Sequence, residues 1–274
     1  MKIYPIQTGS VAVKKRQRDG SRGSGYARLF NTLSDRNWTD LLPIYAWVIE
    51  HPEGILVIDT GETGKTGFPG YFPWWQPYFR FGAKFTVDPV DEIGPQLRRR
   101  GILTNDVRWV ILTHLHTDHA GGLHHFPESE IFVSRKEFVL ASGIAGKLNG
   151  YLPHRWPRWF NPTLVDYQSR DDSIMNAYLL TKSGDVRIVP TPGHTPGHQS
   201  VVLQSDGKTF VFAGDASYTE ENLMQNVIDG VSLDVAVAQD TLDRLSAFVT
   251  SNNAVYLPSH DPAAAERIRN ALEV

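Results

Sequence analysis

VRWVILTHLHTDHAGG, residues 107–122, decides the fold class because an apolar run leads directly into a group of metal-binding side chains. The branched and aromatic residues of the apolar half predict a buried strand. Beyond it, His114 and His116 alternate along an extended segment, so both imidazoles project to the same side of the chain. Asp118 continues that side, and His119 follows where the chain turns into Ala-Gly-Gly. The segment therefore predicts a metal site at the end of a strand.

The spacing His-x-His-x-Asp-His suits a pair of metal ions. One short segment of this kind can supply two ligands to one ion and two to a neighbour about 3.5–4 Å away. Imidazole nitrogen and carboxylate oxygen together favour a divalent ion, with zinc the usual occupant and iron, manganese or cobalt possible. The sequence contains no cysteine, so histidine and carboxylate must hold any metal. A cluster of surface histidines beside a helix-capping aspartate is the alternative interpretation.

Length and composition indicate an ordinary globular protein. The 274 residues are enough for one large α/β domain or two small ones, and 41% of them are hydrophobic and 21% charged. A net charge of −3 gives no electrostatic reason to expect nucleic acid or an anionic membrane as a partner. The N-terminus lacks the apolar segment of a secretory signal, and no stretch approaches the roughly 20 apolar residues of a membrane helix. We therefore expect a cytoplasmic protein.

Short apolar runs rich in β-branched residues recur along the chain, with helical patterns between them. The predicted strands are 46–50, 54–61, 108–114, 130–134, 186–194, 200–204, 209–215 and 254–260, and the predicted helices are about 91–101, 134–142, 232–251 and 262–272. Such interleaving indicates an α/β fold with helices covering the sheets, and residues 1–274 show no internal boundary, which predicts a single domain. Four of the strands end in a potential ligand, namely Asp59, His114, Asp215 and His260. Function gathers at such strand ends, because the loops there can present side chains over a rigid sheet.

Taken in order, the motifs of the chain resemble those of the metallo-β-lactamase superfamily. Beside THLHTDH at 113–119, they are VIDTG at 57–61, PTPGHTPGH at 190–198, FAGDAS at 212–217 and LPSH at 257–260. The resemblance covers roughly residues 40 to 262. It implies a four-layer αββα sandwich with two divalent ions, most often zinc, at one edge between the two sheets.

The resemblance also implies a role for each ligand. The first ion would be bound by His114, His116 and His194, the second by Asp118, His119 and His260, and both by the bridging carboxylate of Asp215. Asp59 would orient the ligand loop from behind. His198 is expected to be structural, since the family ligand is the histidine just before Thr-Pro-Gly.

Within the superfamily, GDASYTEEN at 214–222, with HLHTDHAGG and GHTPGHQS, resembles the N-acyl homoserine lactone lactonases that break down bacterial quorum-sensing signals. The resemblance implies that a metal-bridging hydroxide opens the lactone ring to give an N-acyl homoserine. Tyr218 would donate a hydrogen bond to the carbonyl oxygen, and Asp118 would carry the proton to the leaving group. A tyrosine that only packs in the core is the alternative. Thr117 stands where that family often has an aromatic residue, which puts the shape of the pocket in doubt more than the chemistry.

Two segments, 68–85 and 150–162, combine aromatic residues with prolines and show neither helix nor strand periodicity. We expect ordered loops pinned by aromatic packing. A small-molecule lactone with an acyl tail needs an apolar trough beside the metals, and these segments could line it. They could equally form a homodimer interface or pack on the body of the domain. The residues predicted for the trough are Trp74, Trp75, Tyr78, Phe79, Trp156, Trp159 and Phe160.

Other interpretations of the chain stay open. A hydrolase of the same fold could act on aryl esters or organophosphate triesters, and a non-catalytic binding protein could keep a metal for stability alone. The remaining histidines match no motif, so we expect surface or packing roles for them; they are His51, His124, His125 and His154. The glycine-rich run at 20–25 is expected to form a mobile surface loop that opens no helix.

Overall fold

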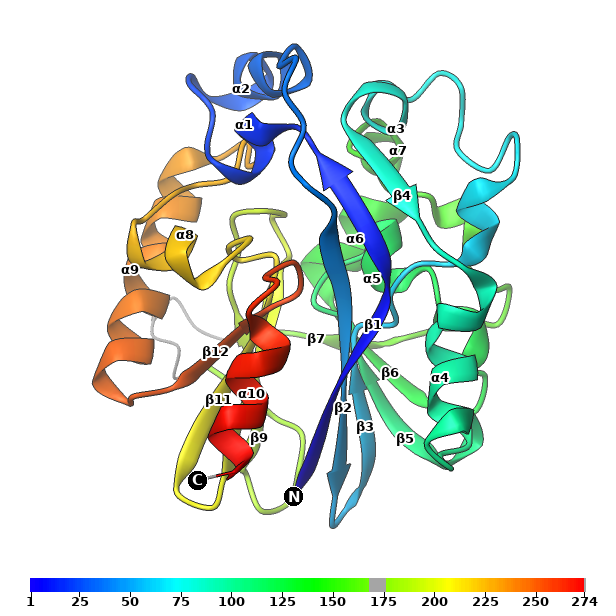
Figure 1. Ribbon diagram of the computed structural model, residues 1–274, viewed down its shortest axis with the longest axis vertical. Helices are drawn as coiled ribbons and strands as arrows, with labels where there is room; N and C mark the ends of the chain where they lie inside the picture. Colours follow the sequence, from blue (N-terminus) through cyan, green and yellow to red (C-terminus); the bar gives the residue numbers. More distant parts are fainter. Residues whose placement is uncertain (168–175, 274) are drawn as a thin grey trace. The chain divides into compact units, whose positions relative to one another are not determined.

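The computed structural model describes residues 1–167 and 176–273, and the chain divides into two compact units (Figure 1). The first unit comprises residues 1–13 and 40–164, and the second comprises residues 14–39 together with the chain from 165 onward. Each unit has its own sheet and hydrophobic core. The α/β class predicted from the sequence is confirmed, whereas the organisation as a single domain stays a prediction.

The first unit is built on a seven-stranded sheet in the order β4-β1-β2-β3-β5-β6-β7. The strands are β1 Lys2–Val13, β2 Leu42–His51, β3 Gly54–Ile58, β4 Ala83–Thr86, β5 Val107–Ile111, β6 Glu130–Ser134 and β7 Thr163–Val165. β1 pairs antiparallel with β2 and β4, and β2 with β3, while β3, β5 and β6 run parallel. The strands predicted at 46–50, 54–61, 108–114 and 130–134 correspond to β2, β3, β5 and β6, although β3 and β5 end three residues earlier than predicted. β5 lies between β3 and β6 and leads into the histidine-rich segment.

The first unit also contains several short helices. They are α3 Pro77–Phe81, α4 Ile93–Arg99, α5 Thr117–Ala120, α6 Arg135–Ser142 and α7 Ile144–Leu148, with the 3-10 turns η1 Gly64–Gly67, η2 Pro89–Asp91, η3 Thr104–Asp106, η4 Leu123–His125 and η5 Pro153–Arg155. The helices predicted at 91–101 and 134–142 correspond to α4 and α6. Ile93 and Leu97 of α4 are fully buried in the cluster that contains Val57 of β3 and Val110 of β5, so α4 packs against the sheet (Figure 1).

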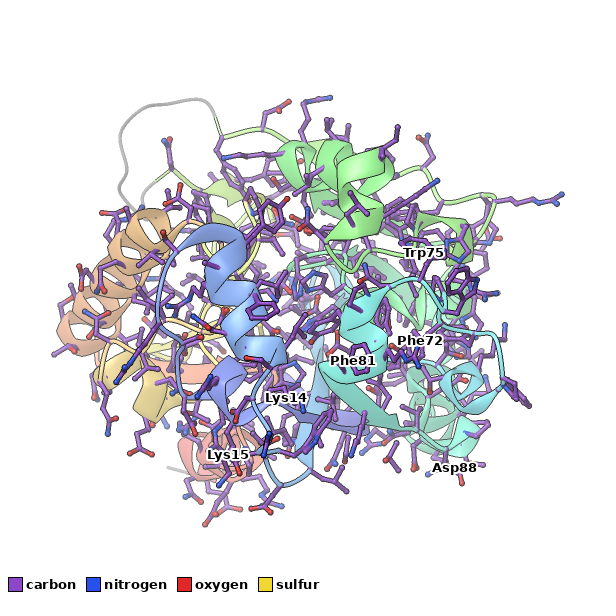
Figure 2. All side chains as sticks on the ribbon, turned by 90° about the horizontal axis from the view of Figure 1, so that it is seen from above. Lys14, Lys15, Phe72, Trp75, Phe81 and Asp88 are labelled. Atoms are coloured by element: carbon purple, nitrogen blue, oxygen red, sulfur yellow. The ribbon has the colours of Figure 1, made fainter. Side chains whose placement is uncertain are left out.

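The aromatic segment 68–85 is ordered by its own side chains. Phe72 (labelled in Figure 2) stacks on Phe79 and on Phe85, and its ring centroid lies 4.4 Å from that of Phe79 and 5.5 Å from that of Phe85. Gln76 Nε2 donates hydrogen bonds to two backbone carbonyls of α7. Packing through aromatics is as predicted, but the expectation of no regular structure was wrong, because the segment contains α3 and begins β4. Pro77 at the first helical position starts α3 despite the irregular pattern.

The second unit holds a five-stranded sheet in the order β12-β11-β10-β9-β8. Its strands are β8 Tyr178–Leu179, β9 Val186–Pro190, β10 Gln199–Ser205, β11 Lys208–Gly214 and β12 Val255–Pro258. β10 and β11 form an antiparallel hairpin whose turn residues, Asp206 and Gly207, have φ values of 51° and 74°. Two positive values in succession are the signature of the tight hairpin turn that Asp-Gly favours. β11 and β12 run parallel.

The helices of the second unit are α1 Lys15–Arg18, α2 Gly25–Leu33, α8 Glu220–Met224, α9 Val235–Ser251 and α10 Ala264–Glu273. The helix predicted at 232–251 corresponds to α9, which begins three residues later because Asp234 caps it by accepting a hydrogen bond from the backbone N–H of Val237. Leu242 and Leu245 of α9 are buried in the core of this unit. The expectation that the glycine-rich run at 20–25 opens no helix was wrong. Helix α2 starts at Gly25, the last glycine of the run. Across the two described stretches of chain, no helix combines the length and apolar character that a membrane span requires.

Candidate metal centre

The histidine-rich segment of the first unit bends sharply after β5. His116 precedes the short helix α5, and its carbonyl accepts hydrogen bonds from the backbone N–H groups of His119 and Ala120 at 3.1 and 3.0 Å. This turn gathers the imidazoles: His114 Nε2 lies 3.0 Å from His116 Nδ1, and the rings of His114 and His119 have centroids 4.0 Å apart. Asp118 Oδ1 lies 3.9 Å from His119 Nε2. The four predicted ligands of this unit therefore form one cluster.

A fully buried carboxylate, that of Asp59, holds this cluster from behind. Asp59 follows β3 with a left-handed φ of 58°, and its Oδ1 accepts a hydrogen bond of 2.8 Å from the backbone N–H of Thr113. Its Oδ2 lies 2.8 Å from Nδ1 of His119. Because a carboxylate only accepts, Nδ1 carries the proton and Nε2 of His119 is the lone-pair nitrogen. That is the tautomer a metal ligand needs.

Glu62 is a buried residue of this region that sequence reasoning missed. The Thr117 hydroxyl donates a hydrogen bond to Glu62 Oε2, and the backbone N–H of Thr63 donates one of 2.9 Å to Oε1. Burial raises the pKa of Glu62 well above its usual value, against the lowering effect of the Thr63 bond. A Cβ on Gly121 would lie 2.4 Å from Glu62 Oε1, which explains why glycine follows the ligand helix. Thr117, unexplained by the sequence, is thus the partner of this carboxyl group.

The second unit gathers its three predicted ligands around one carboxylate. Asp215 follows β11, and its Oδ2 lies 3.5 Å from His194 Nε2, while Oδ1 lies 3.3 Å from His260 Nε2. All three side chains are buried. Ligand atoms on one tetrahedral zinc ion stand about 3.3 Å apart when the bonds are near 2.0–2.1 Å. One carboxylate oxygen facing each imidazole at that spacing is the arrangement that a bridging carboxylate requires.

Asp229, also missed from the sequence, repeats the arrangement found at Asp59. Its Oδ2 lies 2.9 Å from His194 Nδ1, and its Oδ1 accepts hydrogen bonds from the backbone N–H groups of Val231 and Ser232 at 2.8 and 2.7 Å. Burial alone would raise the pKa of Asp229, but its interaction with the Nδ1–H group of His194 and these hydrogen bonds bring it below the ordinary value. Nδ1 of His194 therefore carries a proton, and Nε2 presents its lone pair toward Asp215.

His198 and Tyr218 complete this half. His198 Nε2 accepts a hydrogen bond of 3.1 Å from the backbone N–H of Asp215, so this histidine fixes the loop, in keeping with its predicted structural role. Tyr218 is buried and its ring stacks on His260 with centroids 5.4 Å apart. Its hydroxyl oxygen accepts a hydrogen bond of 2.7 Å from Gln17 Nε2, a contact across 201 positions of sequence. An oxygen that accepts from Gln17 directs its own proton elsewhere as a donor.

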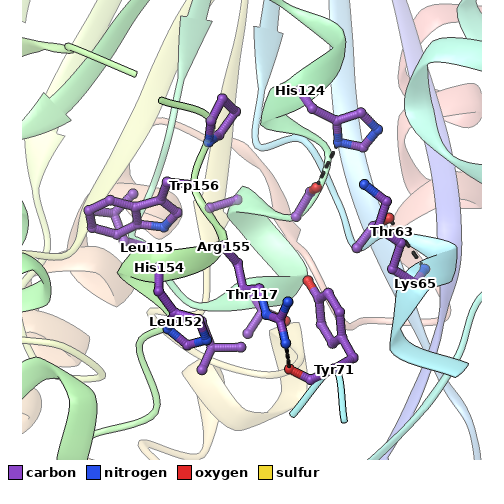
Figure 3. A pocket seen from close by; sticks show the side chains of 13 residues that line it. Thr63, Lys65, Tyr71, Leu115, Thr117, His124, Leu152, His154, Arg155 and Trp156 are labelled. Carbon is purple, nitrogen blue, oxygen red and sulfur yellow. Dashed lines mark hydrogen bonds between the residues drawn. The ribbon is translucent and has the colours of Figure 1, made fainter. Parts of the chain in front are cut away.

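A cavity of about 320 Å³ lies in the first unit beside the ligand segment (Figure 3). Leu115 and Thr117 contribute to its wall, together with Tyr71, His154 and Trp156. Of the seven aromatic residues predicted for a trough, Trp156 lines this cavity. Phe160 packs against Trp156 at 5.3 Å, Tyr78 contacts Phe79 at 5.6 Å, and Trp74, Trp75 and Trp159 are exposed, Trp74 at 83%. The donor set of both units, imidazoles with oriented Nδ1 protons beside carboxylates, fits divalent metal ions.

Known proteins resemble this chain in sequence and in fold. The sequence profile of the Metallo-beta-lactamase superfamily matches residues 39–260. The chain belongs to the metallo-beta-lactamase superfamily. An N-acyl homoserine lactonase AttM of Rhizobium radiobacter is 24% identical over 277 residues, covering 100% of this chain and 98% of the relative. An N-acyl homoserine lactonase of a Bacillus species is 29% identical over 239 residues, covering 84% and 86%.

A solved structure supports the same assignment at the level of the fold. It is an N-acyl homoserine lactone hydrolase with the product N-hexanoyl-L-homoserine bound at the catalytic metal center. It superposes on this superfamily member with a TM-score of 0.76 at 23% identity, covering 97% of this chain and 95% of the other. The metallo-β-lactamase fold implied by the order of the motifs is thereby confirmed.

Proposed function

We propose that this protein is a metal-dependent hydrolase that opens the lactone ring of N-acyl homoserine lactones to give N-acyl homoserines. The observation that carries the proposal is Tyr218, a buried phenol stacked on the motif histidine His260 and hydrogen-bonded to Gln17. It is supported by two lactonases that align with most or all of the chain. A cytoplasmic location and a homodimer remain predictions.

The proposed ligands are those of the five motifs. One divalent ion would be held by His114, His116 and His194, a second by Asp118, His119 and His260, and Asp215 would contact both. When bound, two such ions, zinc by preference, would lower the pKa of water to about 7 and polarise the ester carbonyl. The carboxylates of Asp59 and Asp229 support this assignment, because each fixes the tautomer of one ligand histidine.

The remaining steps belong to side chains of the protein. Tyr218 would donate a hydrogen bond to the carbonyl oxygen as negative charge develops there. Asp118, whose side chain is 15% exposed, would take the proton from water and pass it to the ring oxygen as the carbon–oxygen bond breaks. Water is thus added across the ester bond, giving one hydroxyl group and one carboxylic acid, which releases a proton to solvent to become a carboxylate. Trp156 and Leu115, on the wall of the cavity, offer apolar surface for the acyl tail.

A substrate panel on protein of known metal content tests the proposal. Homoserine lactones with acyl tails of 4 to 12 carbons, aryl esters and an organophosphate triester would be compared by kcat/KM, with acid release as the signal for lactones. We expect the lactones to be the best substrates. Aryl esters or the triester hydrolysed far faster than every lactone would overturn the substrate assignment, and loaded protein inactive on the whole panel would overturn the enzyme assignment.

A further inference from the structure

A second group of metal-binding side chains lies in the first unit, outside the five motifs. Glu92 divides its two carboxylate oxygens between different partners: Oε1 accepts hydrogen bonds from Thr63 Oγ1 and the backbone N–H of Gly64, at 3.0 and 2.9 Å. Oε2 faces two imidazoles, 3.2 Å from His124 Nε2 and 2.7 Å from His125 Nε2. The two hydrogen bonds to Oε1 fix the orientation of the carboxylate. Oε2 therefore points toward both imidazole rings independently of any bond to them.

The tautomer of His124 indicates that a cation lies between its Nε2 and Glu92 Oε2. His124 Nδ1 lies 3.2 Å from the backbone carbonyl of Gly121, as the dashed line in Figure 3 marks. A carbonyl only accepts, so Nδ1 carries the proton and the neutral ring presents a lone pair at Nε2. This lone pair and the Glu92 oxygen are both acceptors, and a cation between them turns their repulsion into attraction. The cation can be a second proton on His124 or a metal ion.

The spacing of the three groups suits a metal ion. Their ligand atoms all lie within 4.8 Å of one another, and 3.2 Å between Glu92 and His124 matches the roughly 3.3 Å between ligands on a tetrahedral zinc ion. The contact of 2.7 Å to His125 is a hydrogen-bond distance, so His125 has to move by only about half an ångström to reach that spacing. Two imidazoles and a glutamate are the donor set of zinc sites that keep an open coordination position.

The surroundings are built to hold these rings and to admit a ligand. A Cβ at Gly94 would lie 2.4 Å from His125 Nδ1, so glycine at this position leaves the space that the ring occupies. Burial tends to raise the pKa of Glu92, but the two imidazoles and the bonds to Oε1 lower it below its ordinary value, so the group is a carboxylate at neutral pH. His124 also lines the 320 Å³ cavity, which gives an ion and its water access from outside.

We propose that Glu92, His124 and His125 form a further binding site for a divalent ion, zinc by preference, with an open position toward the cavity. None of the three belongs to the five motifs, so this ion is additional to those of the proposed hydrolytic centre. Because Glu92 precedes α4 and binds the start of η1 while the histidines come from η4, the ion would tie these three elements together.

Counting zinc ions tests the proposal. Metal-free protein would be dialysed to equilibrium against buffered zinc, and the zinc content would be measured for the parent, His124→Asn and Glu92→Gln. His154→Asn is the matched control, because His154 lines the same cavity and is not one of the three cluster residues. We expect both cluster variants to bind one ion per chain fewer than the parent, and the control to match the parent. Equal counts in parent and cluster variants would overturn the site. The expected difference of one zinc ion between the parent and the cluster variants does not depend on the total zinc content. It would therefore be seen even if the proposed hydrolytic centre bound no metal.

Nitrogen-15 NMR of the parent imidazoles covers the case in which a variant does not fold. At zinc saturation, His124 is expected to keep a protonated Nδ1 and to show a metal-shifted Nε2. Two protonated nitrogens on His124 at zinc saturation would mean that a proton, not a metal ion, links it to Glu92, and would overturn the proposal.

Discussion

Replacing Asp229 by asparagine should move the ring proton of His194, a proposed metal ligand, from Nδ1 to Nε2 while leaving the shape of the site almost unchanged. The backbone N–H groups of Val231 and Ser232 only donate, so the asparagine carbonyl oxygen must take the place of Oδ1. Its amide group then stands where Oδ2 was, 2.9 Å from His194 Nδ1, and donates to that nitrogen. The proton of the neutral ring moves to Nε2, the nitrogen that faces Asp215, and the lone pair needed for a metal is lost.

The expected effect is a 10- to 100-fold loss of metal affinity at the site of His194, the usual range for a residue behind a ligand, or about 1.4–2.8 kcal/mol. Zinc competition with a chromophoric chelator measures it directly, and lactone turnover at limiting zinc should fall in parallel. Asp240→Asn makes the same chemical change on an exposed carboxylate of α9 and serves as the control. A folded Asp229→Asn protein with zinc affinity within twofold of the parent would refute the role of Asp229.

Four other substitutions, one of them a control, test separate parts of the protein. Tyr218→Phe should lower lactone turnover by about 10- to 100-fold, the weaker end of losing an oxyanion donor, with metal content unchanged by mass spectrometry; unchanged turnover would leave Tyr218 a packing residue. Gly121→Ala, whose Cβ would lie 2.4 Å from Glu62 Oε1, should lower the free energy of unfolding in urea by about 1–3 kcal/mol. Gly67→Ala, with nothing within 4 Å, should change it by less than about 0.5 kcal/mol, and equal effects of the two would contradict the packing argument. Asp215→Ala should release metal and abolish activity, and a metal content equal to that of the parent would exclude a bridging role.

The parts of the site that follow from sequence are those in which the deciding residues are neighbours along the chain. The segment 113–119 predicts its own cluster, because a strand that ends in alternating histidines and then turns must bring those rings together. The hairpin between β10 and β11 is equally local, since Asp206 and Gly207 select the turn. The longest strand that the structure describes, β1, was not predicted, because its local sequence pattern is irregular. It contains Pro5 and an irregular register between Gln7 and Ser10, which break the alternation that identifies a strand.

Contacts between distant positions could not be predicted in this way. Asp229 lies 35 residues from His194, and Gln17 lies 201 residues from Tyr218. Nothing in the local pattern around Asp229 or Gln17 distinguishes them from other polar residues in loops. Glu62 is intermediate, since it follows the motif aspartate by three positions, but its role depends on burial against the ligand helix, which only the fold determines.

The carboxylates of Asp59 and Asp229 each fix the tautomer of one proposed ligand, His119 and His194 respectively. Asp59 reaches His119 from the end of a strand, in a left-handed conformation that costs a residue other than glycine about 1–2 kcal/mol. Asp229 reaches His194 from a loop and is stabilised there by backbone N–H groups. The two elements share no sequence pattern, yet each places a carboxylate 2.8–2.9 Å from Nδ1 of a motif histidine. Core packing alone would require neither the backbone strain at Asp59 nor the buried charge at Asp229. Because both fix the same tautomer, they support the proposal that Nε2 of these two histidines binds a metal ion.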